Sequence, residues 1–128
     1  MNAEATRDYF LSKPEAVLDY PFGGDVEVFK VKGKMFGTLG WEEDLARINL
    51  KCDPEQALML RDVFDAVLPG YHMNKAHWNT VLLDGSLPAG ELQRMIDHSY
   101  GLVVRKMPKA ERTALEVQYG KEHLYNAL

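Results

Sequence analysis

The chain has 128 residues, of which 46% are hydrophobic and 27% charged, a size and composition typical of one globular domain. The formal net charge of -4 excludes a uniformly basic surface, and the single cysteine, Cys52, excludes an internal disulfide and any multi-cysteine metal cluster. No run approaches the roughly 18 apolar residues of a membrane span. Glu4, Arg7 and Asp8 stand where a signal peptide needs an apolar core, so we expect one cytoplasmic domain over residues 1–128.

The first segment predicts a helix followed by a strand. Tyr9 and Phe10 favour a helix over roughly residues 4–13, and Pro14 ends it because the residue before a proline avoids helical geometry. Residues 16–20 favour a strand, which the turn residues Pro21, Gly23 and Gly24 close.

The next stretch changes to the two-residue period of strands. Residues 26–31 and 34–41 form two such runs, so we expect a hairpin that turns at Lys32–Gly33. An acidic loop at 42–44 precedes a third run, in which Arg47, Asn49 and Lys51 alternate with apolar residues. That alternation predicts a strand with one buried face and one polar, basic face.

The second half predicts helices around one further strand. Asp53 and Pro54 are an N-cap and a first helical residue, and the expected buried stripe is Ala57, Leu60, Val63, Phe64 and Val67, with Pro69–Gly70 as the end. Residues 78–83 alternate like a strand.

The two helices expected last follow this strand. Ser86 and Pro88 open the longest one, whose three-four spacing predicts a buried stripe of Leu92, Met95, Ile96, Ser99, Tyr100, Val103 and Val104. Pro108 begins the last expected helix, which carries Ala114, Leu115 and Val117 and stops at Gly120. Helices that flank sequential antiparallel strands predict a single α+β domain, with a twisted antiparallel sheet and helices packed on one face.

Positive charge is concentrated in short segments of this acidic chain. Residues 1–25 and 53–70 together hold nine acids against three bases, whereas residues 71–83 hold Lys75 and no acid. The candidate phosphate contacts are the hairpin lysines Lys30, Lys32 and Lys34, the strand residues Arg47 and Lys51, and Lys75. Lysines at a hairpin edge also keep sheets from aggregating, so both interpretations stay open.

The densest polar cluster is residues 71–80, which contains His72, Asn74, His77 and Trp78. One interpretation is a ligand-binding groove, and the other is that the polar groups satisfy loop backbone while Trp78 packs in the core. Two histidines five positions apart do not share a helical face, so we expect no metal there, and no cofactor. No pattern of nucleophile and base supports an enzyme.

Several segments carry a resemblance to a known family. They are Pro21-Phe22-Gly23, residues 28–36 and 49–54, the run Pro69–Val81 with its His-x-Asn-Lys-x-His-Trp motif, Asp84-Gly85 and Asp97-His98-Ser99-Tyr100. Over about residues 5–112 the chain resembles the MmcQ/YjbR family of small bacterial proteins, with residues 113–128 as a helical extension. The resemblance implies a frataxin-like (CyaY-like) α+β fold and the family's usual label, a DNA-binding protein with a double-wing motif.

The resemblance implies DNA contact through hairpin wings that present Lys30, Lys32 and Lys34, with Lys75 and the Arg47/Lys51 face as a second contact. Such binding is to the phosphate backbone, and it is weak and salt-sensitive. The alternative is a module that binds a protein or small ligand through the His72–Trp78 segment or the polar sheet face. A third hypothesis, from the fold alone, is iron binding by the N-terminal acids Glu4, Asp8, Glu15 and Asp19.

Overall fold

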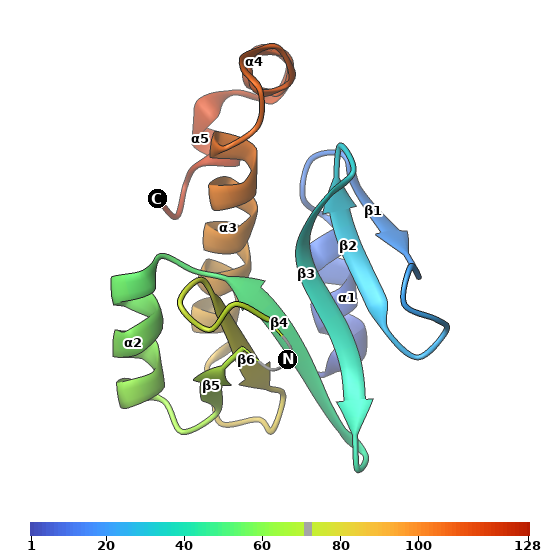
Figure 1. Cartoon of the computed structure of the whole chain (residues 1–128), viewed down its shortest axis with the longest axis vertical. Helices are drawn as coiled ribbons and strands as arrows, with labels where there is room; N and C mark the ends of the chain where they lie inside the picture. Colours follow the sequence, from blue (N-terminus) through green and yellow to red (C-terminus); the bar gives the residue numbers. More distant parts are fainter. Residues whose placement is uncertain (71–72) are drawn as a thin grey trace.

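The computed structural model describes residues 1–70 and 73–128 as one α+β domain (Figure 1). In chain order the elements are α1 (Ala3–Leu11), β1 (Ala16–Asp19), β2 (Glu27–Val31), β3 (Lys34–Glu42), β4 (Leu45–Lys51), α2 (Pro54–Val63), β5 (Val67–Pro69), β6 (Trp78–Leu82), α3 (Ala89–Arg105), α4 (Lys109–Tyr119) and α5 (Lys121–Leu124). In the described part of the chain no helix is long and apolar enough to cross a membrane.

The strands form a six-stranded sheet in the order β1-β2-β3-β4-β6-β5, and every neighbouring pair is antiparallel. The last two strands do not follow chain order in the sheet: β6 pairs with β4, and β5 pairs with β6 at the outer edge. Pro69 closes β5, which suits an edge strand because proline has no N–H to donate to a further neighbour.

The hairpin of β2 and β3 turns as its sequence predicts. Lys32 and Gly33 both have positive φ, 47° and 78°, the conformation that two-residue hairpin turns require. Phe29 pairs with Gly37 and Lys30 pairs with Met35, so Phe36 is an extra residue in β3. This bulge lets Phe36 face the core, where its ring lies 5.1 Å from that of Tyr100 on α3.

Helices α1, α2 and α3 pack against the same face of the sheet. Phe10 of α1 stacks on Phe29 with ring centroids 4.2 Å apart, and it lies so close to β3 that a Cβ on Gly37 would come within 2.2 Å of its ring. Ala57 of α2 and Ile96 of α3 join the same buried cluster. The predicted packing of helices on one face is confirmed, and Figure 1 shows the opposite face free of helices.

Two predicted helix details are wrong. Helix α2 ends at Val63, which is 62% exposed, and the extended backbone of Phe64 (φ -118°, ψ 119°) turns the chain so that Val67 enters β5. On α4, Leu115 is buried as predicted, but Ala114 is exposed and Val117 is 82% exposed. The helical tail is nevertheless part of the core, because Leu115 and Leu124 are both 0% exposed.

Candidate functional site

The face of the sheet opposite the helices, hereafter the open face, carries a polar ladder across its centre. Thr38, Asn49 and Thr80 are cross-strand neighbours on β3, β4 and β6. The Asn49 amide donates to Thr38 Oγ1 at 3.0 Å, and the Thr80 hydroxyl donates to Asn49 Oδ1 at 2.5 Å. Arg47 and Lys51 flank Asn49 on the same face, so the polar strand face that the alternation predicts is present.

Two of the three hairpin lysines form ion pairs with carboxylates. Lys30 Nζ lies 2.8 Å from Asp19 on β1, and Lys32 Nζ lies 3.4 Å from Glu15. The hydrogen bond from Lys30 lowers the pKa of the Asp19 carboxyl. Lys34 is exposed and forms no ion pair with any residue in the described ranges. Of the hairpin lysines, Lys34 alone therefore offers a full charge to an external anion.

Of the two cationic residues on β4, one is ion-paired within the described chain and the other is not. Arg47 Nη1 lies 3.1 Å from Glu42, whereas Lys51 makes no ion pair within residues 1–70 and 73–128. Burial, with a smaller effect of the nearby Lys106 charge, lowers the pKa of Lys51. Because the opposite charge of a nearby anion favours the charged ammonium and so counteracts both effects, Lys51 is the strand residue most suited to a phosphate.

Lys34, Lys51, Lys75 and Lys106 lie at one end of the sheet, hereafter the cationic end. Lys34 begins β3 and Lys51 ends the antiparallel β4, so both lie at the same end. Lys51 pairs with Trp78 at the start of β6, and the exposed Lys75 precedes this strand by three residues. Lys106 caps α3 beside Lys51.

The opposite end of the same strands is acidic. The β3–β4 hairpin turns at Glu43 and Asp44, next to Glu42, and eight residue steps of β3 separate it from Lys34. At about 3.3 Å a step, these ends are about 26 Å apart. Figure 1 shows the β2–β3 and β3–β4 turns at opposite ends of the sheet.

The 72–78 segment satisfies its own backbone where it is described. The Asn74 side chain accepts a hydrogen bond from Ala76 N at 2.9 Å, and the Asn74 carbonyl accepts from His77 N at 3.1 Å. The His77 carbonyl accepts from Cys52 N at 2.8 Å, which ties the segment to the end of β4. His72 lies outside the described residues. The structure thus places Asn74, His77 and Trp78 on one chain segment at the start of β6, with the Asn74 side chain bonded within that segment.

Arg61 is a residue whose role the sequence analysis missed. From α2 it donates to Asn79 Oδ1 at 2.7 Å, to the Trp78 carbonyl at 3.3 Å and to the Lys75 carbonyl. These bonds hold the loop that carries Lys75 against α2. No local signal marks it, because an arginine in a helix usually faces solvent.

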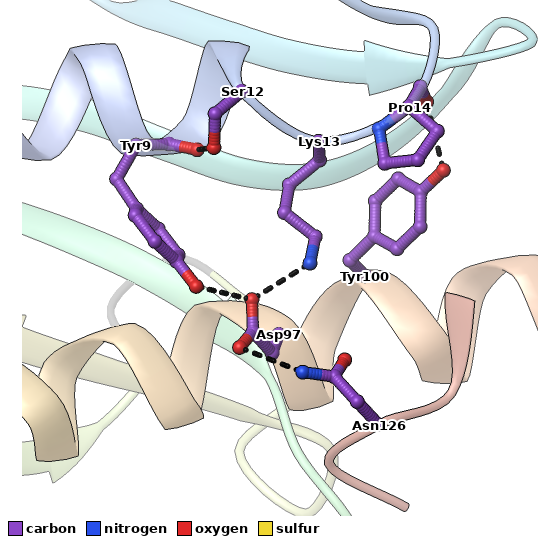
Figure 2. Close-up of polar contacts among 7 residues, drawn as sticks. All are labelled: Tyr9, Ser12, Lys13, Pro14, Asp97, Tyr100 and Asn126. Atoms are coloured by element: carbon purple, nitrogen blue, oxygen red, sulfur yellow. Dashed lines mark hydrogen bonds and ion pairs between the residues drawn. The ribbon is translucent and has the colours of Figure 1, made fainter. Parts of the chain in front are cut away.

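The Asp97-His98-Ser99-Tyr100 motif joins α3 to the rest of the domain (Figure 2). Asp97 accepts hydrogen bonds from Tyr9 and Lys13, each at 2.7 Å, and from Asn126 at 3.3 Å. The Tyr100 hydroxyl donates to the Pro14 carbonyl at 2.7 Å. Burial, with Asp97 as a second cause, raises the pKa of Tyr9.

His98 and Ser99 bind other elements. His98 Nε2 accepts from Asp53 N at 3.3 Å while its Nδ1 lies 2.9 Å from the Ala127 carbonyl, so the proton belongs on Nδ1. Ser99 donates to the Phe36 carbonyl at 2.6 Å and accepts from Lys51 N at 2.9 Å. Successive helical residues point about 100° apart, so these four side chains together reach the 9–14 segment, the start of α2, strands β3 and β4, and the C-terminal residues. This motif is structural.

Two candidate metal ligands are paired with lysines, and the thiol of the one cysteine is buried. Glu15 and Asp19, two of the four N-terminal acids, are paired with Lys32 and Lys30. In the described part of the chain no three His, Cys, Asp or Glu side chains are arranged to hold a metal ion. Cys52 is buried, which raises the pKa of its thiol to about 11 and keeps it protonated at neutral pH.

Comparison with protein families gives one clear match: the YjbR family model covers residues 11–102. Among curated proteins, the chain is similar to the uncharacterized protein YbdF of Escherichia coli O157:H7, with 34% identity over 85% of this chain and 89% of that one. It is also similar to the uncharacterized protein YjbR of Escherichia coli K12, with 36% identity over 84% of this chain and 91% of that one.

Solved structures agree with this match. The crystal structure of Deinococcus radiodurans protein DR2400, with family-model domain DUF419, superposes with a TM-score of 0.83 at 36% identity and covers 95% of this chain and 96% of its own. A crystal structure from Pseudomonas syringae superposes with a TM-score of 0.71 at 34% identity, over 80% of this chain and 99% of its own.

Proposed function

The chain belongs to the YjbR family, and from the DNA binding that this resemblance implies, together with its cationic end, we propose that it is a non-enzymatic protein that binds the DNA backbone. The observation that carries the proposal is that Lys34, Lys51 and Lys75 come from the same end of the sheet and have no carboxylate partners in the described structure. The other three candidates, Lys30, Lys32 and Arg47, each face an acid.

The proposed contact is to phosphate rather than to bases. Lysine offers a mobile ammonium group without the planar fork that reads base edges. The three lysines come from a strand start, a strand end and a loop, so they present charge without a helix that could enter the major groove. The expected affinity is therefore weak, nearly independent of sequence and steeply dependent on salt.

Fluorescence anisotropy of a labelled random-sequence duplex tests this proposal. We expect saturable binding at low salt that weakens as salt rises. The double variant Lys34→Gln/Lys51→Gln should lower the slope of log affinity against log salt by about 2, since each phosphate contact contributes about 0.9.

The control is Arg94→Gln/Lys121→Gln, which makes the same change in net charge on α3 and α5. This control should keep most of the affinity, and circular dichroism should show both variants folded. Absence of binding at low salt, or equal losses in the two variants, would show that the cationic end is not a DNA site.

The alternative function, a module for a small ligand, has one observation in its favour. Met73, at the start of the described part of the 72–78 segment, lines a cavity on the open face. That cavity lies toward the acidic end of the sheet.

A further inference from the structure

A cavity of about 490 Å³ lies on the open face, over the ends of β3 and β4 that are remote from Lys34 and Lys51. The loop between β1 and β2 forms one side of it through Phe22, Asp25 and Val26. Thr38 and Asn49 line it from the sheet, and their side chains are already bonded to each other. Strand residues line its base and loop residues line its side, and binding residues commonly lie on loops held by a rigid scaffold.

Its walls combine two large aromatic side chains that have little other packing. Phe22 is 69% exposed and Trp41 is 58% exposed, and both line the cavity. Leaving two such rings in water costs free energy unless a partner covers them. Gly40 also lines the cavity, and a Cβ added there would first meet the Asp25 carbonyl oxygen at 3.9 Å, so there is room above this residue.

The cavity also holds charges of both signs. Arg47 pairs with Glu42 at 3.1 Å, and its enclosed Nε has no hydrogen-bond partner among the described residues. Asp25 is exposed and has no ion pair within the described ranges. A purely anionic ligand would face two carboxylates, and a purely cationic ligand would face the guanidinium. A ligand with both charges satisfies both sides.

We propose that this cavity binds a free α-amino acid with a large apolar side chain. The ligand carboxylate lies at Arg47, the ammonium lies at Asp25, and the side chain lies against Phe22, beside the end of β3 at Trp41. Although Arg47 Nη1 pairs with Glu42, its Nε has no hydrogen-bond partner among the described residues and can donate to the ligand carboxylate, and an aromatic ring covers a flat side chain at little entropic cost. This inference goes beyond DNA binding, and it uses none of Lys34, Lys51 and Lys75.

Isothermal titration calorimetry with three probes tests the proposal: L-phenylalanine, 3-phenylpropionate, which lacks the ammonium group, and phenethylamine, which lacks the carboxylate. We expect L-phenylalanine to bind at least tenfold more tightly than either analogue. Equal affinities for the three would show a merely apolar surface, and no heat with L-phenylalanine at millimolar concentration would overturn the proposal.

Two variants locate the charges. Asp25→Asn, at an exposed position, should lower the affinity for L-phenylalanine to that for 3-phenylpropionate. Arg47→Gln should remove the advantage of L-phenylalanine over phenethylamine. Asp65→Asn changes an exposed acid outside the cavity lining and is the matched control, which should leave all three affinities unchanged. An unchanged affinity in Asp25→Asn would contradict the proposed orientation.

Discussion

Replacing Asp97 by asparagine isolates the charge that joins α3 to Lys13 in the segment after α1 (Figure 2). The side chains of Lys13 and Asp97 are 9% and 10% exposed, and Lys13 Nζ lies 2.7 Å from Asp97 and 5.2 Å from the centre of the Tyr100 ring. Asparagine has the same shape and still accepts from Tyr9, so Asp97→Asn leaves Lys13 as a buried charge without its counter-ion.

The expected cost follows from that burial. Removing one partner of a buried ion pair costs about 3–5 kcal/mol, and we expect about 3 kcal/mol because the asparagine oxygen keeps its hydrogen bonds. For a domain of 128 residues this corresponds to a decrease of about 10 °C in the melting temperature. If the unpaired ammonium is the cause, Lys13→Met/Asp97→Asn should regain about 2 kcal/mol relative to Asp97→Asn.

Urea unfolding followed by far-ultraviolet circular dichroism measures these free energies. The control is Lys30→Met/Asp19→Asn, because that ion pair has a similar distance, 2.8 Å, but lies at the surface and should contribute little. A loss below about 1 kcal/mol in Asp97→Asn would refute the reasoning. So would a loss of DNA affinity in folded Asp97→Asn, because the motif would then act in binding.

Two further outcomes are expected. Ser99→Ala removes the partner of the Phe36 carbonyl and of the Lys51 N–H at a fully buried position, so urea unfolding should show a loss of about 2 kcal/mol or more, and a loss near zero would mean that water replaces the hydroxyl. Cys52 should react with iodoacetamide only slowly at pH 8, because the pKa of its thiol in the folded protein, about 11, exceeds that of an unfolded thiol. The same difference in pKa should make the free energy of unfolding fall as the pH rises above about 9, because the unfolded thiol then loses its proton first. Rapid labelling without denaturant would contradict the burial of Cys52.

The sequence predicted correctly those features of the fold that depend only on neighbouring residues. The Lys32–Gly33 turn needs two residues with positive φ, and the start of α2 needs an N-cap followed by proline, so both could be identified from neighbouring residues alone. The end of α2 carries no glycine or proline, and Val67 continues the apolar spacing of the helix. The sequence therefore could not show that the chain leaves the helix at Val63.

Ion pairing of the hairpin lysines could not be predicted in the same way. Lys30 meets Asp19 because β1 pairs with β2 in one particular register, and that register depends on the whole sheet. Asp97 and His98 likewise look like solvent-facing helix positions, yet both are buried by partners from the two ends of the chain. The sequence indicated which residues are charged, but which of them remain unpaired depends on long-range contacts.

A net charge of -4 is compatible with anion binding because the charges of this protein are separated in space. The acidic β3–β4 turn lies about 26 Å from the cationic end, at about 3.3 Å per strand residue. Electrostatic interactions between exposed charges decay over about 8 Å at physiological ionic strength. A phosphate at Lys51 therefore senses Lys34 and Lys106 more strongly than it senses Glu43 or Asp44. At low salt the decay length reaches about 30 Å, so the acidic turn then opposes the approach of a polyanion. The proposed carboxylate position at Arg47 lies four strand residues, about 13 Å, from Lys51, which is more than one such decay length at physiological ionic strength, so a zwitterion there and a phosphate at Lys51 interact only weakly.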